Sequence, residues 1–186
     1  RGQLSHRLRP AMTISGESGP GVRRATVSDV PQMVALAADR VPGEVGRLVE
    51  DLTTRITATD TCAGFVVDEG EEVVGWGVVR HVEPSVVDDE HAPPGWYLMG
   101  VIIRDDRQRR GHGAALTRAR LDWLGTRTDR AYYFTDADNE ASRLLHASFG
   151  FQWVRDGLTP RTLTFDGGPM TLYQLDVTTS ARTPVG

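Results

Sequence analysis

Hydrophobic positions along the chain follow two periods that predict different elements. Val30, Met33, Val34 and Ala37 recur at intervals of three and four, which predicts an amphipathic helix, and a second such pattern spans residues 45–56 after a Pro-Gly break. Short apolar runs follow instead over residues 63–67, 73–82 and 96–103. These runs predict strands, and the acidic turn at residues 68–72 predicts that the first two form an antiparallel hairpin.

Helical and strand patterns then alternate in the second half. We expect a helix over residues 114–124, a strand over 131–135, a helix over 139–149 that Gly150 ends, and closing strands over 151–154 and 170–175 around a Gly167-Gly168 turn. With a first short strand at residues 21–25, this order predicts an α/β (α+β) domain with a mixed central sheet of about six to seven strands and flanking helices. The domain spans residues 21–176, between tails at 1–20 and 177–186.

Composition excludes several classes of protein. The 186 residues carry a net charge of −4, and all 21 basic residues are arginine. The absence of lysine excludes a Schiff-base or P-loop lysine, and the acidic balance disfavours nucleic-acid binding. No apolar run approaches the ~20 residues that span a bilayer, and no secretory signal is evident, so we expect a cytoplasmic protein without a membrane partner. A single cysteine, Cys62, excludes an internal disulfide and a multi-cysteine zinc site, and we expect no metal.

The turn between the 96–103 strand and the next helix has the composition of an anion site. Gly111 and Gly113 leave backbone N–H groups uncovered at a helix N-terminus, where the helix dipole favours negative charge. Four arginines surround the turn and add positive potential: Arg104, Arg107, Arg109 and Arg110. Leu116 stands where a Rossmann fingerprint needs glycine, and the simplest alternative is a flexible turn.

Two motifs together favour a ligand site over a flexible turn. Gln108-x-x-Gly111-x-Gly113 follows a strand, and Asn139 and Ser142 are followed by Phe149-Gly150-Phe151. Over residues 21–176 the chain resembles the GNAT (GCN5-related) N-acetyltransferase family, which carries both blocks at this separation. The resemblance implies a sheet splayed at an acetyl-CoA site.

The resemblance also implies which residues bind acetyl-CoA, the co-substrate. Turn amides would bind the pyrophosphate and the preceding strand the pantetheine arm, and Asn139 and Ser142 would contact the pantetheine from their helix. An interior glycine such as Gly100 often marks a bulge or a close backbone approach, which agrees with this placement. The full set of expected cofactor-binding residues is Val101, Ile102, Ile103, Gln108, Arg109, Arg110, Gly111, His112, Gly113, Ala114, Asn139, Ser142 and His146.

One position departs from the family pattern. His146 replaces the tyrosine that protonates the departing thiolate of coenzyme A in the family. Residues 139, 142 and 146 are spaced by three and four, so they share one helix face. His146 is therefore a candidate general acid, and the alternative is that it fills space or hydrogen-bonds the cofactor.

The implied reaction is direct acetyl transfer to a primary amine through a tetrahedral intermediate. The Val101 amide would polarise the thioester carbonyl. Glu83 and Asp136 are candidate bases, although Glu83 and the acids near it are more typical of a solvated acidic loop. Cys62 is expected to be a small buried residue rather than a nucleophile. Further acidic candidates are Glu50, Asp51, Asp88, Asp89 and Glu90.

Carboxylates around the acceptor site favour a cationic amine, such as an aminoglycoside. The segments 115–123 and 132–134 are similar to a small-molecule-modifying branch of the family, near kasugamycin-type 2′-N-acetyltransferases, which would make antibiotic resistance a biological role. Two alternatives stay open: a peptide or protein amine acetyltransferase, and a coenzyme A-binding module without catalysis. Many relatives dimerise through closing strands, so we expect a homodimer.

Overall fold

A computed structural model of the chain describes residues 21–38, 44–83, 93–158 and 170–177. Both predicted tails (apart from Val177), the Gly167-Gly168 turn and the acidic candidates Asp88, Asp89 and Glu90 lie outside these ranges. Within them, seven strands form one sheet in the order β1-β2-β3-β4-β5-β7-β6. The strands are β1 (Gly21–Arg24), β2 (Cys62–Glu69), β3 (Glu72–Val82), β4 (Gly95–Ile103), β5 (Arg130–Thr135), β6 (Gln152–Leu158) and β7 (Met170–Asp176).

The sheet is mixed, as predicted. Neighbouring strands pair antiparallel except for β4 and β5, which are parallel. A parallel pair needs a crossover connection, and here the helix α3 provides it. The helices are α1 (Val30–Ala37), α2 (Val45–Thr57), α3 (His112–Leu124) and α4 (Glu140–Ala147), with single 3-10 turns η1 (Val27–Asp29) and η3 (Asp105–Arg107).

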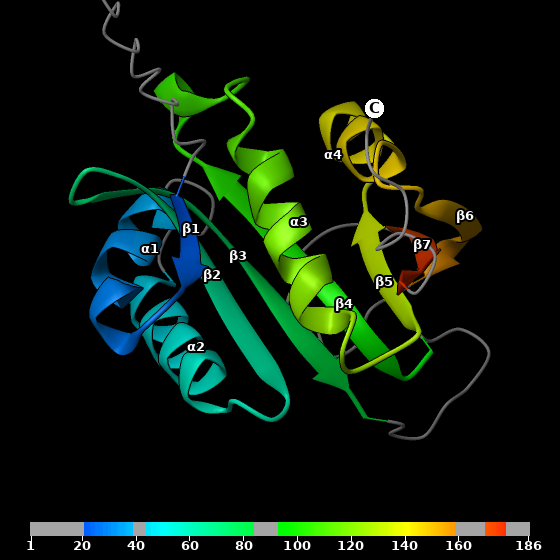
Figure 1. Cartoon of the computed structure of the whole chain (residues 1–186), viewed down its shortest axis with the longest axis horizontal. Helices are drawn as coiled ribbons and strands as arrows, with labels where there is room; N and C mark the ends of the chain where they lie inside the picture. The colour runs from blue at the N-terminus through cyan, green and yellow to red at the C-terminus, as the bar shows by residue number, and fades with distance from the viewer. Residues whose placement is uncertain (1–20, 39–43, 84–92, 159–169, 178–186) are drawn as a thin grey trace, which may run out of the picture.

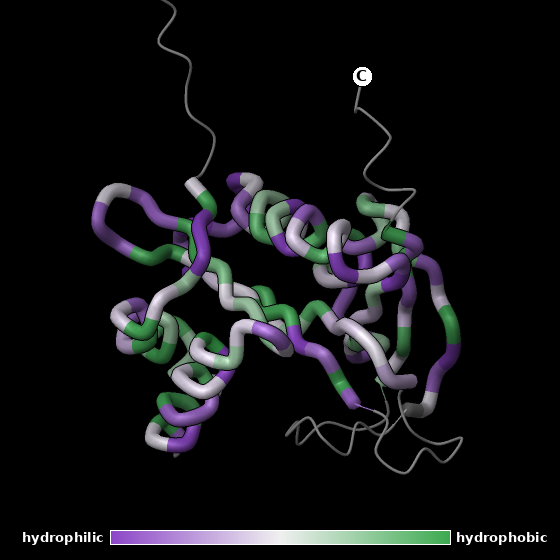
Figure 2. The backbone as a smooth tube through the Cα atoms, turned by 60° about the horizontal axis from the view of Figure 1, so that its bottom comes forward, coloured by the Kyte–Doolittle hydropathy of each residue, from purple (hydrophilic) through white to green (hydrophobic). Residues whose placement is uncertain are grey.

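Helices cover both faces of the sheet (Figure 1). On one face α1 and α2 bury Met33 and Leu52 against Val66 and Trp76, and the Trp76 indole donates a hydrogen bond to the Met33 carbonyl at 2.8 Å. On the other face α3 packs on β2, β3 and β4. Figure 2 shows the central strands largely hydrophobic and the outer sides of the helices largely hydrophilic, as burial of one helix face requires.

The predicted elements therefore all occur in the described residues, with bounds that differ by a few positions. The helix predicted over residues 139–149 is shorter, because Asn139 caps α4 rather than joining it and Gly150 has a φ of +91°. No described helix is long and apolar enough to cross a bilayer. The described residues also contain no cluster of three or more His, Cys, Asp or Glu side chains that could hold a metal ion.

Candidate active site

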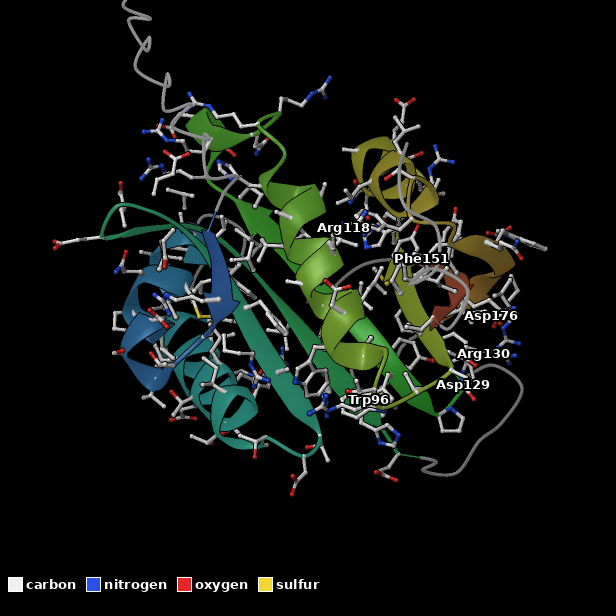
Figure 3. All side chains as sticks on the ribbon, in the orientation of Figure 1. Trp96, Arg118, Asp129, Arg130, Phe151 and Asp176 are labelled. Carbon is white, nitrogen blue, oxygen red and sulfur yellow. The ribbon has the colours of Figure 1, made fainter. Side chains whose placement is uncertain are left out.

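Strands β4 and β5 meet at one end and separate toward the other. Trp96 pairs with Ala131 and Tyr97 with Tyr132, and no later residue of β4 pairs with the described residues of β5. Figure 1 shows the two strands close together at the lower right and diverging toward the end of the sheet where α4 lies. Trp96, labelled in Figure 3, packs edge-on against Trp123 of α3 at 5.3 Å and closes the paired end. We call the unpaired stretch beyond Tyr97 and Tyr132 the splay.

A bulge interrupts β4 next to the splay. Val101 lies opposite Gly77 and Met99 lies opposite Val78, so Gly100 is an extra residue in the β3–β4 ladder. Gly100 has a φ of +59°, a left-handed conformation that glycine adopts without steric cost. The sequence-based expectation of a bulge or a close approach at this glycine is confirmed.

The ladder directs the Val101 amide into the splay. Arg104 donates from its backbone N–H to Val74, so these two residues form a hydrogen-bonded pair of the β3–β4 ladder. Hydrogen-bonded and non-hydrogen-bonded pairs alternate in an antiparallel ladder, which makes Trp76 and Ile102 a bonded pair and Gly77 and Val101 a non-bonded pair. The N–H of Val101 therefore points away from β3, toward the side where β5 has separated.

The turn before α3 forms the other end of the site. Gly111 precedes α3 with a φ of +86°, and Arg109 also has a positive φ, +62°. A non-glycine residue in this region is strained, and such strain is concentrated at functional sites. The first N–H groups of α3 have no partner within the helix, and the positive end of its dipole lies here. Arg109 and Arg110 are exposed beside these groups, so the turn suits a phosphate group.

Two of the four predicted arginines do not serve this anion site. Arg104 forms ion pairs with Asp106, at 2.7 Å, and with Glu72. Arg107 forms ion pairs with Asp106 and Glu69, both at 2.8 Å. Because carboxylates already pair with Arg104 and Arg107, Arg109 and Arg110 are the stronger candidates for positive potential at this turn, and the anion site stays a prediction.

Side chains of the motif hold the turn, while its backbone faces outward. The Gln108 amide nitrogen donates to Asp105 at 2.8 Å, and the buried His112 ring contacts Glu69 at 2.9 Å through Nε2. A Cβ at Gly113 would lie 3.4 Å from the Leu145 side chain and 3.7 Å from that of Val101. Both distances are ordinary van der Waals contacts, and they show that Gly113 lies where α3 meets α4 and β4. Ala114 is exposed in the first turn of α3.

Helix α4 carries the second motif. The Asn139 side-chain oxygen accepts a hydrogen bond from the Ser142 N–H at 3.1 Å, so Asn139 is the N-cap and its amide group stays at the helix start. His146 lies one turn beyond Ser142 and is 4% exposed. Its Nδ1 lies 2.8 Å from the Ser142 carbonyl, which can only accept, so Nδ1 carries the proton.

The surroundings of His146 favour its neutral form. Burial, and then the positive charge of Arg120, lower the pKa of His146 to about 4. At neutral pH the ring is therefore uncharged, and its one N–H is held by its own helix. These facts count against protonated His146 as the acid, and that role stays a prediction. The ring instead stacks on Tyr133 with centroids 3.8 Å apart.

Two buried polar groups near His146 were not singled out from the sequence. The Tyr133 hydroxyl of β5 is buried and has no hydrogen-bond partner among the described residues. Arg120 of α3 is 0% exposed, and its positive charge acts on His146. Burial of these two polar groups could not be predicted from the sequence pattern, because that pattern places apolar residues at the buried positions of a helix or a strand.

The candidate bases lie at different heights along the sheet. Tyr97 and Tyr132 are paired. Because Gly100 is an extra residue of the bulge, Val101 lies three ladder positions beyond Tyr97, level with Thr135 and one residue short of Asp136. Glu83 follows Val82, which pairs with Gly95 at the start of β4. That is about 20 Å from Val101 at the usual rise per strand residue. The structure therefore brings Asp136, and not Glu83, within about one residue of the level of the Val101 amide.

Three other residues considered from the sequence, Asp51, Glu83 and Cys62, have contacts or burial that bear on their expected roles. Asp51 pairs with Arg55 one turn along α2 at 3.1 Å, and Glu83 contacts His81 at 2.9 Å. Cys62 is buried, and burial raises the pKa of its thiol, as expected of a small structural residue rather than a nucleophile.

Comparisons with known proteins agree on one family. The family model described as acetyltransferase (GNAT) family matches residues 31–151, which include both motifs. An N-acetyltransferase of Staphylococcus aureus Mu50 has 18% identity and a TM-score of 0.67, covering 87% of this chain and 100% of that one. The ribosomal-protein-alanine N-acetyltransferase of Brucella melitensis has 18% identity and a TM-score of 0.65, covering 83% and 98%. The yncA structure of Salmonella typhimurium, solved with its cofactor acetyl-CoA, has 16% identity and a TM-score of 0.65, covering 86% and 95%. Comparison with curated proteins gives no match.

Proposed function

The chain belongs to the acetyltransferase (GNAT) family, and from this premise we propose that it transfers acetyl from acetyl-CoA to a primary amine of a small cationic molecule. The observation that carries the proposal is the Val101 amide, which faces the splay between β4 and β5. The N-terminus of α3, whose backbone N–H groups suit an anion, lies close to Val101, because a Cβ at Gly113 would be 3.7 Å from the Val101 side chain. A thioester and a pyrophosphate, the two ends of acetyl-CoA that need recognition, thus have complementary groups in one place.

Different groups of the site would bind different parts of acetyl-CoA. Backbone N–H groups of residues 111–114, with the Arg109 and Arg110 side chains, would hold the pyrophosphate. The backbone of residues 101–103 would hydrogen-bond the pantetheine arm, and the free amide of Asn139 and the Ser142 hydroxyl would contact it from α4. Gln108 and His112 support the site indirectly, because their side chains brace the turn.

The proposed reaction is a direct attack. The neutral amine nitrogen forms a bond to the thioester carbonyl carbon, and the carbonyl oxygen becomes an oxyanion that the Val101 N–H stabilises. Asp136 takes the proton that the attacking nitrogen loses. Collapse of the intermediate breaks the C–S bond, and coenzyme A leaves as a thiolate that takes its proton from water. His146 is buried and neutral at pH 7, so this scheme does not require a proton from it, and its role as the acid stays a prediction.

The face of the sheet opposite α3 and α4 supports a cationic acceptor. Met99 and Phe134 are partly buried there, on the two strands that border the splay. Asp136 is the first residue after β5 and stands two positions beyond Phe134, so strand alternation carried one residue past Thr135 would put both side chains on one face. An aromatic ring and a carboxylate together favour an ammonium group. An aminoglycoside of the kasugamycin type would present such groups, and its acetylation would give antibiotic resistance.

The main alternative acceptor is a peptide α-amine. The name of the Brucella melitensis relative states a ribosomal-protein alanine as the acceptor of that protein. A peptide would reach the same thioester, so the two acceptors differ only in the surface that holds the rest of the molecule. A homodimer and a cytoplasmic location stay further proposals.

The test is release of free thiol from acetyl-CoA by the full chain with a panel of amines. The panel contains kasugamycin, other aminoglycosides, polyamines, amino acids and short peptides, and each antibiotic is matched by the same molecule with its amines already acetylated. We expect turnover with a cationic antibiotic and none with its blocked form. Turnover with peptides alone would move the proposal to the alternative acceptor. Acetyl-CoA binding without turnover on any amine would indicate a non-catalytic coenzyme A-binding module.

A further inference from the structure

A fully buried arginine lies behind the β4 bulge. Arg120 of α3 is 0% exposed, and its guanidinium makes three hydrogen bonds. Nη1 donates to the Gly100 carbonyl at 3.1 Å, Nε to the Leu116 carbonyl at 3.2 Å, and Nη2 to the Thr117 hydroxyl at 3.1 Å. Among the described residues no carboxylate forms an ion pair with Arg120. An uncompensated buried charge is costly, and its retention needs a reason.

The surroundings are shaped to admit this contact. A Cβ at Gly77 would lie 2.9 Å from the Gly100 carbonyl oxygen and 3.1 Å from Arg120 Nη1. Only glycine at this position therefore leaves room for the carbonyl and the guanidinium together. Gly100 itself has the positive φ that turns its carbonyl toward β3 and α3. Three positions far apart in the sequence thus combine in one contact.

We propose that Arg120 is a positioning residue for acetyl transfer, which acts through the Gly100–Val101 peptide to aim and polarise the Val101 N–H toward the thioester carbonyl. The proposal rests on the proposed acetyl-CoA site and adds to it a residue outside both sequence motifs. Arg120 touches neither acetyl-CoA nor the acceptor in this account.

The peptide plane explains how a contact on one side acts on the other. In a trans peptide the C=O of Gly100 and the N–H of Val101 point in opposite directions. Holding the carbonyl against α3 therefore fixes the amide toward the splay. A hydrogen bond from a charged donor to the carbonyl also polarises the peptide and strengthens its N–H as a donor.

Polarisation of the Gly100–Val101 peptide requires a positive charge on Arg120, and this charge is present at neutral pH. Burial lowers the pKa of Arg120 to about 9, which still leaves it protonated at pH 7. The titratable groups that face this region are His146 of α4, which is neutral there, and Tyr133 of β5, whose pKa burial raises. Neither group neutralises the guanidinium, so its field acts on the peptide and on the oxyanion beyond it.

The test uses Arg120→Met in the full chain, which keeps most of the volume and removes the charge and the donors. Arg118→Met is the matched control, because Arg118, labelled in Figure 3, is an exposed arginine of the same helix. Its guanidinium lies over the Phe149 ring. The probe is acetyl-CoA labelled with ¹³C at the thioester carbonyl, whose infrared stretch falls when the oxygen accepts a hydrogen bond. Calorimetry compares acetyl-CoA with coenzyme A, which lacks that carbonyl.

We expect the carbonyl band of bound acetyl-CoA to lie lower than that of free acetyl-CoA in the wild type and in Arg118→Met. In Arg120→Met the band returns toward the free value, and the preference for acetyl-CoA over coenzyme A falls about tenfold, the worth of one hydrogen bond. Arg120→Lys, which keeps the charge and one donor, restores part of the shift. A purely structural role would lower stability and leave the band and the preference unchanged, which would overturn the proposal.

If circular dichroism shows that Arg120→Met is unfolded, Gly77→Ala tests the proposal instead. This variant displaces the Gly100 carbonyl and keeps the charge of Arg120. Loss of the band shift in Gly77→Ala would support the proposal, and a wild-type band would overturn it. A wild-type protein that binds no acetyl-CoA would overturn the proposed function and this proposal together. If acetyl-CoA binds and neither variant changes its carbonyl band, the proposal for Arg120 is overturned and the proposed function stands.

Discussion

Tyr97 and Tyr132 form the last pair of the β4–β5 ladder, and their rings stack with centroids 5.1 Å apart. Phe134 stacks on Tyr97 as well, also at 5.1 Å, so three aromatic rings hold the point from which the strands separate. Stacked aromatic pairs contribute about 0.5–1.5 kcal/mol beyond their buried area. This stack fixes the register of the two strands, and the register in turn places Asp136 within one residue of the level of Val101.

That register predicts that Asp136 and not Glu83 is the base. Asp136→Asn is expected to lower kcat about a hundredfold or more with the best amine of the panel, because the attacking nitrogen loses its proton acceptor. The loss should shrink as the pH is raised and the amine becomes neutral without help. Asp138→Asn, in the same exposed loop, is the control that should retain wild-type kcat. A large loss in Glu83→Gln with a normal Asp136→Asn would contradict the register argument.

Arg109 is predicted to combine backbone strain with a functional charge. Its φ of +62° costs an ordinary side chain about 1 kcal/mol, which glycine avoids and asparagine tolerates better than most residues. Arg109→Gly and Arg109→Asn should therefore unfold at the same or a slightly higher urea concentration. Both should bind acetyl-CoA more weakly, by about tenfold, because a cation beside the pyrophosphate is lost. Unchanged affinity in both variants would show that the side chain does not reach the phosphates.

Buried His146 predicts a loss of stability on mild acidification. Its pKa is about 4 in the folded protein, against 6.5 for a solvent-exposed histidine, so the unfolded chain binds more protons between these values. Stability is therefore full above pH 6.5 and falls as the pH drops toward 4, by about 1–3 kcal/mol from this residue. The groups that face the ring are Arg120 of α3 and Tyr133 of β5.

Urea unfolding at several pH values checks this, with His146→Phe as the variant that keeps a flat ring and removes the titration. Its stability should fall less than that of the wild type between pH 6.5 and 4. Below this range Asp29, whose pKa Arg23 holds at about 2, accounts for a further loss in both proteins. A wild type that gains stability as the pH falls to 5 would carry a protonated His146, which would then be available as a general acid.

Much of the fold and half of the site could be predicted from the sequence, because both depend on local patterns. Apolar spacing is a property of single helices and strands, and a glycine-rich turn before a helix needs only its own backbone to present N–H groups. The turn could be predicted from Gly111 and Gly113 for this reason. The bulge at Gly100 could be predicted too, since glycine in a strand interior has few other uses.

The rest depends on contacts between distant segments. Which arginines are neutralised depends on Glu69 and Glu72 of the β2–β3 hairpin, which pair with Arg107 and Arg104 across the fold. The height of Asp136 follows from the β4–β5 register, which no local pattern encodes. Arg120 occupies a position where the helix pattern would bury an apolar side chain, and only the joint arrangement of Gly77 and Gly100 shows why it is tolerated.

The most direct test of the acetyl-CoA site is a calorimetric titration of acetyl-CoA into the wild-type chain and into Gly111→Val. A Cβ at Gly111 meets no atom within 4 Å, so the valine is opposed by the φ of +86° and not by a clash. A β-branched residue does not hold that conformation, and the turn must refold away from the pyrophosphate. We predict one acetyl-CoA site per chain in the wild type and at least about a tenfold weaker site in the folded variant, with KM raised to match. Equal binding by the two proteins would place acetyl-CoA elsewhere and contradict the account.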